Sequence, residues 1–134
     1  MAAVAFSDYR RLVVKVGSSL LVNESGQLTR HWLQSLADDL AELQQDNHEV
    51  LIVSSGAIAL GSSVLGINKK RARLPDLQAA AAAGQVQLVH AYQEALGRHR
   101  IQAAQILLTP EDTENRRRFL NARSTLGRLL DLSV

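Results

Sequence analysis

Three short apolar runs, separated by segments with helical periodicity, constrain the fold more than any other feature of this sequence. The runs occupy residues 11–16, 50–53 and 103–108 and do not alternate strictly between polar and apolar positions. This pattern is typical of strands that are covered on both faces of a parallel sheet. The segments between the runs are too long for hairpins, so each crossover carries helices. We therefore predict an α/β fold of β-α-β-α-β order, with a parallel β-sheet sandwiched by helices in a Rossmann-like three-layer arrangement.

The helices can be placed from their start signals and from the spacing of apolar residues. Thr29 is a candidate N-cap for a helix that runs to about Asp46. Pro110, directly after Thr109, marks another helix start. Further helices are expected at residues 57–65, 76–97 and 117–132, and residues 18–26 are expected to form a polar connection.

Residues 79–84 of the long third helix consist of five alanines followed by a glycine. Such a segment has high helix propensity and almost no side-chain bulk. We therefore expect another backbone element to pack closely against it.

Composition excludes several classes of protein. The 134 residues include no Cys, which excludes a disulfide scaffold, a thiolate nucleophile and a cysteine metal site. Fifteen Lys and Arg against thirteen Asp and Glu leave a net charge of +2, so nucleic acid is not an expected partner. The four His lack metal-ligand spacing. The basic run at residues 116–118 is interpreted as a solvated helix start or a subunit contact.

No run approaches the roughly 18 consecutive apolar residues of a membrane span. Residues 1–11 also lack the long apolar core of a signal peptide. We therefore expect a soluble, cytoplasmic protein that does not insert into membranes.

In open parallel sheets, ligands bind beyond the carboxyl ends of the strands, so the residues after each run are the first candidates for a site. After the first run, Lys15 stands inside an otherwise apolar strand and is followed by Gly17, Ser18 and Ser19. A desolvated ammonium group is costly, so Lys15 either extends to solvent at the strand end or points at an anionic ligand. Glycine and free N–H groups suit a polyphosphate, although the spacing is not that of a P-loop.

After the second run, Ser54, Ser55 and Gly56 lead directly into a helix. A helix start offers free N–H groups and the positive end of the helix dipole, which favour an anion. An ordinary serine N-cap with a turn glycine would explain the same residues. Because both junctions must lie on one rim of the sheet, the pair favours phosphoryl transfer between two anionic substrates.

At these junctions the sequence resembles a known family. The matching segments are Val14-Lys15-Val16-Gly17-Ser18-Ser19-Leu20, Val53-Ser54-Ser55-Gly56-Ala57-Ile58-Ala59-Leu60-Gly61, Gly84-Gln85, Gln105-Ile106-Leu107-Leu108-Thr109 and Phe119-Leu120-Asn121-Ala122-Arg123. In this order and spacing they resemble the glutamate 5-kinase family of the amino-acid kinase superfamily, from about Arg11 onward. The Lys-x-Gly-Ser-Ser and Phe-Leu-Asn-Ala-Arg segments separate it from acetylglutamate, uridylate and carbamate kinases.

The resemblance implies ATP-dependent phosphorylation of the γ-carboxylate of L-glutamate to L-glutamyl 5-phosphate, the first step of proline biosynthesis. It implies that Lys15 is catalytic and steadies the transferring phosphoryl group, while Gly17 and Ser18 approach the ATP phosphates. The residues that it implies for glutamate binding are Ser55, Gly56 and Ala57. ATP and Mg²⁺ are the implied cofactors, with metal ligands outside this chain, and the full-length form is implied to be a homo-oligomer.

Members of that family continue beyond the matching residues. We therefore expect residues 1–134 to be a partial, amino-terminal, substrate-side part of a kinase domain, without the nucleotide lobe or any PUA domain, and to be inactive alone. Two alternatives stay open. The chain could be a non-catalytic fragment or interaction piece of such a kinase, or the start of a bifunctional pyrroline-5-carboxylate synthase.

Overall fold

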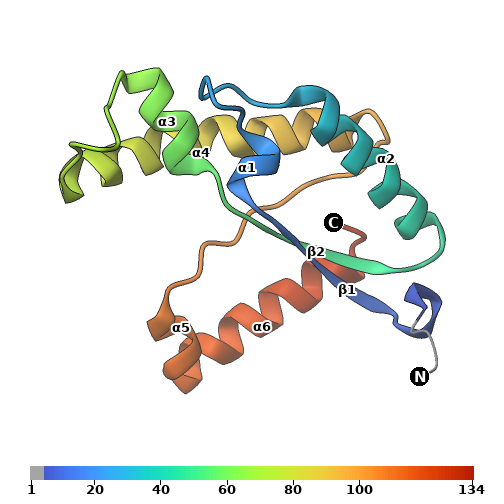
Figure 1. Ribbon diagram of the computed structural model, residues 1–134. Coiled ribbons are helices and arrows are strands. Elements are labelled where there is room, and N and C mark those ends of the chain that lie inside the picture. The colour runs from blue at the N-terminus through green and yellow to red at the C-terminus, as the bar shows by residue number, and fades with distance from the viewer. Residues whose placement is uncertain (1–4) are drawn as a thin grey trace.

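Helices gather on both sides of a pair of strands in the computed structural model (Figure 1). The structure describes residues 5–134, so residues 1–4 of the segment expected to lack a signal peptide lie outside the description. The elements are η1 (Phe6–Asp8), β1 (Arg11–Val16), α1 (Ser18–Leu21), α2 (Arg30–Gln45), β2 (Glu49–Ser54), α3 (Ala57–Leu65), α4 (Leu74–Gly97), α5 (Pro110–Glu114) and α6 (Arg116–Asp131). The predicted helices are confirmed, but the prediction that residues 18–26 form only a polar connection is wrong, because α1 forms within them. None of the helices described is both long and apolar enough to cross a bilayer.

The strands β1 and β2 pair in parallel, with Arg11 opposite Glu49 and Val16 opposite Ser54. Because the two strands are parallel and their ends are paired, both carboxyl ends lie at the same rim of the sheet. One face packs on the core formed with α2 and α4, whereas Val13 and Val53 on the other face are 65% and 54% exposed. Helices α2, α3 and α4 lie on one side of the sheet and α6 lies on the other (Figure 1), so the predicted sheet between helices is confirmed, although the face that carries Val13 and Val53 is only partly covered.

Residues 103–108 do not form the predicted third strand, and the sheet of the described chain contains only β1 and β2. Residues of β2 and residues 101–104 and 106 instead line a common cavity of about 770 Å³. An extended segment becomes a strand only where a neighbouring backbone exchanges hydrogen bonds with it. Ala103 packs against the core, but Leu107 remains 72% exposed. The α/β class and the parallel pairing are confirmed, and the β-α-β-α-β order is not.

Helices α3 and α4 touch through their backbones. A Cβ atom on Gly84 would overlap the carbonyl oxygen of Ala57, and one on Gly61 would overlap that of Ala80. The expected close approach to the alanine-rich segment is confirmed. Since Ala57 is the first residue of α3, the amino end of that helix lies directly against α4.

The amino ends of the strands are held by charged side chains. The Nε atom of Arg11 donates to Oε2 of Glu49 at 2.8 Å, and Arg10 reaches Oε1 of the same carboxylate at 2.9 Å. The hydrogen bond from Arg11 holds the pKa of Glu49 below its usual range, with a smaller Coulombic contribution from Arg10. These ion pairs lie at the end of the sheet opposite the predicted site.

Candidate functional site

The two junctions singled out in the sequence meet at the carboxyl rim of the sheet. The backbone N–H of Ser55 donates to the carbonyl oxygen of Val16 at 3.1 Å, and the Ser55 hydroxyl donates to the same oxygen at 3.2 Å. These bonds join the end of β2 to the end of β1. The predicted juxtaposition of the junctions is therefore confirmed.

Lys15 lies on the exposed face of the sheet, opposite Val53 in the strand register. The premise that a fully buried strand desolvates its ammonium group is wrong, because α2, α3 and α4 pack on the other face. Among the described residues, Lys15 takes part in no ion pair. Its charge therefore stands at the rim without a protein counterion in the described part of the chain.

Gly17 follows Lys15 and is the N-cap of the short helix α1. Its backbone angles, φ −78° and ψ 153°, are ones that any residue adopts. A Cβ atom there would meet nothing within 4 Å. Neither the local conformation nor a neighbour in the described chain requires glycine at this position.

Gly56 has φ 120°, which strongly disfavours a residue with a side chain. A Cβ atom there would lie 3.6 Å from Cγ2 of Val22, an ordinary contact. Conformation, rather than space, thus requires glycine at this turn. The turn directs the chain into α3, where the N–H of Leu60 is the first to find an intrahelical acceptor, the Gly56 carbonyl.

The N–H groups of residues 56–59 have no hydrogen-bond acceptor in the described part of the chain. They lie at the positive end of α3, a helix of nine residues. Both donors of Ser55 are directed at Val16, so its hydroxyl oxygen presents lone pairs rather than a proton to an approaching ligand. The junction can therefore accept an anion on its backbone and a cation on Ser55.

Helix α4 supports this junction from the core side. The Tyr92 hydroxyl donates to Oγ of Ser54 at 3.0 Å, and Ser54 in turn donates to the carbonyl oxygen of Ser55 at 3.3 Å. Burial raises the pKa of Tyr92, partly offset by the bond to Ser54, so the hydroxyl keeps its proton at neutral pH. Sequence reasoning missed Tyr92, because nothing in the helical pattern of α4 separates it from other partly buried residues.

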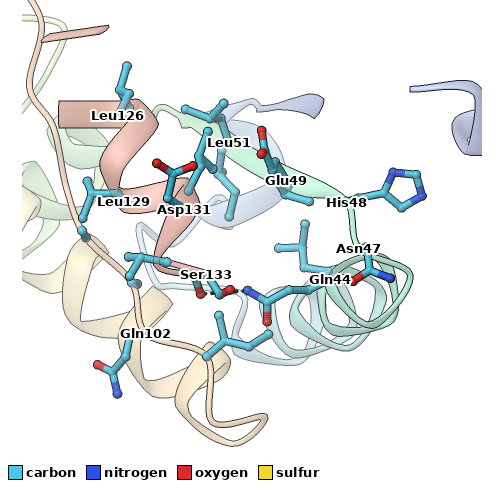
Figure 2. A pocket seen from close by; sticks show the side chains of 18 of the residues that line it. Gln44, Asn47, His48, Glu49, Leu51, Gln102, Leu126, Leu129, Asp131 and Ser133 are labelled. Carbon is cyan, nitrogen blue, oxygen red and sulfur yellow. Dashed lines mark hydrogen bonds between the residues drawn. The ribbon is translucent and has the colours of Figure 1, made fainter. Parts of the chain in front are cut away.

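The large cavity lies near the amino ends of the strands, away from the candidate site. Figure 2 shows Leu126 and Leu129 of α6 on one side of it, with Glu49 and Leu51 of β2 and Gln44 of α2 around it. The side chain of Gln44 donates to the carbonyl oxygen of Ser133 at 3.0 Å, which ties α2 to the chain after α6. The candidate site is thus an open rim and not this cavity.

The remaining polar clusters have local structural partners. Asn115 caps α6 by accepting from the N–H groups of Arg117 and Arg118, and Arg118 pairs with Glu111 at 2.7 Å. These contacts support the interpretation of residues 116–118 as a solvated helix start. Within residues 5–134, no three His, Asp or Glu side chains come together in a group that could hold a metal ion.

Comparison with known proteins gives consistent matches. A model of the "Amino acid kinase family" matches residues 10–134. Proteins named "Glutamate 5-kinase" from Brucella ovis, Brucella canis and Brucella abortus are 58% identical to the chain over 127 residues. Each alignment covers 95% of this chain and 34% of the relative, so the chain spans about a third of the length of the curated relatives it matches.

Proposed function

This chain belongs to the amino acid kinase family, and we propose on that basis that it acts as part of a glutamate 5-kinase. The proposed reaction transfers the terminal phosphoryl group of ATP to the γ-carboxylate of L-glutamate, giving L-glutamyl 5-phosphate and ADP, the first step toward proline. The observation that carries this proposal is the shared rim, where a free ammonium group and a free helix start lie on neighbouring strand ends. The proposal places the reaction in the cytoplasm, where both substrates are available.

The β1 junction is the proposed phosphate side of the rim. Lys15 supplies an exposed cation that has no protein counterion in the described chain, and Gly17 leaves its backbone open. Phosphoryl transfer depends mainly on positioning and on stabilising charge as it moves between oxygens. The Lys15 ammonium fits that role, and the start of α1 at Ser18 adds N–H donors beside it.

The β2 junction is the proposed glutamate side. The free N–H groups of Gly56 and Ala57 fit a carboxylate of the substrate. The Ser55 oxygen, whose proton is directed at Val16, fits the substrate's ammonium group as an acceptor. The α-carboxylate and α-ammonium groups of glutamate would thereby be held, and its γ-carboxylate, which accepts the phosphoryl group, would stay free to react.

Magnesium does not fit the described residues, since no group of carboxylates is assembled at the rim. The proposal therefore assigns phosphate and amino-acid binding to the described residues, and no metal centre. We expect the 134-residue chain alone to form no glutamyl phosphate above background.

The test is trapping of glutamyl phosphate as its hydroxamate, using the protein in its full encoded length with ATP and a divalent cation. L-Glutamate should give an ATP-dependent signal, and N-acetylglutamate and L-aspartate should give far less. A protein that phosphorylates N-acetylglutamate in preference, or that gives no signal with glutamate, would contradict the proposal.

A further inference from the structure

The turn that joins β2 to α3 is contacted by α4 near both of its ends. At the strand end, the Tyr92 hydroxyl donates to Ser54 Oγ. At the helix end, Gly84 lies so close to the Ala57 carbonyl that no Cβ atom would fit between them. Residues 84 and 92 are separated by roughly 12 Å along the helix axis and share one face of α4, since an α-helix rises 1.5 Å per residue.

The hydroxyl chain from Tyr92 reaches the backbone of the turn itself. Ser54 Oγ accepts from Tyr92 and donates to the carbonyl oxygen of Ser55. That carbonyl shares a planar peptide group with the N–H of Gly56, which points to the opposite side. Holding the carbonyl of Ser55 therefore sets the direction of the Gly56 N–H, one of the free donors at the start of α3.

The Tyr92 ring is itself well anchored. It packs against the hydrophobic core that includes Leu33 and Leu88, and it is half-buried. A hydroxyl on an anchored ring is a stiffer support than one on a solvent-exposed side chain, because few rotamers are open to it. The position of α4 therefore determines where the Tyr92 hydroxyl contacts the turn.

We infer that α4 acts as a clamp on the glutamate-binding turn, with Tyr92 as a positioning residue that acts through Ser54 and with Gly84 as the second point of contact. This inference rests on the proposed function, because it assigns the clamped donors to glutamate. The clamp sets the affinity for glutamate. In the described chain Tyr92 does not hydrogen-bond to the Lys15 junction, so loss of the clamp should leave the geometry of that junction unchanged.

The kinetic test is Tyr92→Phe in the protein of full encoded length, matched against Tyr9→Phe. Tyr9 is 51% exposed, and its hydroxyl takes part in no hydrogen bond within the described chain. Removing one neutral hydrogen bond should raise the KM for glutamate about three- to tenfold. The kcat and the KM for ATP should stay within about twofold of the parent, and Tyr9→Phe should change none of the three constants.

A double mutant tests whether Tyr92 acts through Ser54. Ser54→Ala should raise the KM for glutamate by itself, and Tyr92→Phe combined with it should add little more, because both changes break the same chain of hydroxyls. Additive effects would show that Tyr92 acts by another route and would overturn the clamp. Equal rises in both KM values, together with a large fall in Tm, would reduce Tyr92 to general support of the fold and would also overturn it.

Amide hydrogen exchange gives a readout that does not depend on activity. Tyr92→Phe should speed exchange of the Ser55 N–H, which donates to Val16, and leave the amide of Leu12 in β1 unchanged. Unchanged exchange at Ser55 would contradict the clamp. A parent protein that fails to phosphorylate glutamate would contradict the proposed function, and the exchange result would then decide on the clamp alone.

Discussion

The two strand-to-helix junctions on the rim are built in different ways. The β2 junction contains Gly56 with φ 120°, is bonded to the end of β1, and is contacted by α4 through Tyr92 and Gly84. The β1 junction contains Gly17 in an ordinary conformation, with nothing within 4 Å of the place where a Cβ atom would be. The backbone conformation requires glycine at position 56, whereas nothing in the described chain requires it at position 17.

Because of this difference, the effect of a substitution on the free energy of unfolding can be distinguished from its effect on substrate binding. A substitution at the β2 junction or at its contact with α4 should lower stability as well as function. A substitution at the β1 junction should leave stability almost unchanged, so that any loss of activity reports on the phosphate groups that we propose to bind there. The two junctions can therefore be distinguished by measuring unfolding and kinetics on the same variants.

The largest expected effect is that of Gly84→Val, since the added carbon atoms would overlap the Ala57 carbonyl and force α3 away from α4. The free energy of unfolding should fall by about 3 kcal/mol or more. Gly127→Ala is the matched control, because that helical glycine has open space around it and alanine should stabilise α6 by about 0.5 to 1 kcal/mol. Urea unfolding followed by circular dichroism measures both, and a mild effect of Gly84→Val would refute the backbone contact.

Lys15→Ala should lower kcat on the order of a hundred- to a thousandfold, because one preorganised charge is lost where charge moves during transfer. The KM values should change much less, and stability should be unaffected because the side chain is exposed. Lys15→Arg should also be poor, since a planar guanidinium does not replace a compact ammonium. Lys70→Ala is the control, because Lys70 is an exposed lysine in the connection between α3 and α4, outside both junctions. A kcat within a few-fold of the parent would show that Lys15 merely extends into solvent.

Alanine at the two rim glycines should give opposite results in stability. Gly56→Ala should cost about 1 to 2 kcal/mol, because a residue with a side chain is forced to positive φ. Gly17→Ala should change the free energy of unfolding by less than about 0.5 kcal/mol. Thermal and urea unfolding measure both variants. Equal losses in the free energy of unfolding would contradict the proposed difference between the two junctions.

The sequence was sufficient to predict the parallel pairing of the first two runs and the positions of the helices, because periodicity and start signals are local. It also predicted that both junctions would share a rim, since parallel strands end together. The third strand was not correctly predicted, because residues 103–108 have the composition of a strand but no neighbour in the described chain. Strand formation depends on a partner that composition alone does not supply.

The exposure of the Lys15 side chain and the role of Tyr92 could not be predicted from the sequence either. The apolar neighbours of Lys15 suggest burial, yet the face of β1 that carries it is only partly covered in the described chain. Tyr92 lies 38 residues from Ser54 along the chain, and only the packing of α4 against the core brings the two hydroxyls together. Both outcomes depend on which face of an element meets another, which is a tertiary property.

The central claim is that the β2 junction binds glutamate and the β1 junction binds the phosphates of ATP. Saturation curves in each substrate, measured on Ser55→Ala and Gly17→Ala in the protein of full encoded length, test it most directly. Ser55→Ala should raise the KM for glutamate by the loss of one hydrogen bond to a charged group, about 1.5 to 3 kcal/mol, and leave the KM for ATP nearly unchanged. Gly17→Ala should raise the KM for ATP and leave that for glutamate nearly unchanged. If Ser55→Ala instead shifts only the ATP curve and Gly17→Ala only the glutamate curve, the assignment of the two junctions is reversed and the account is contradicted.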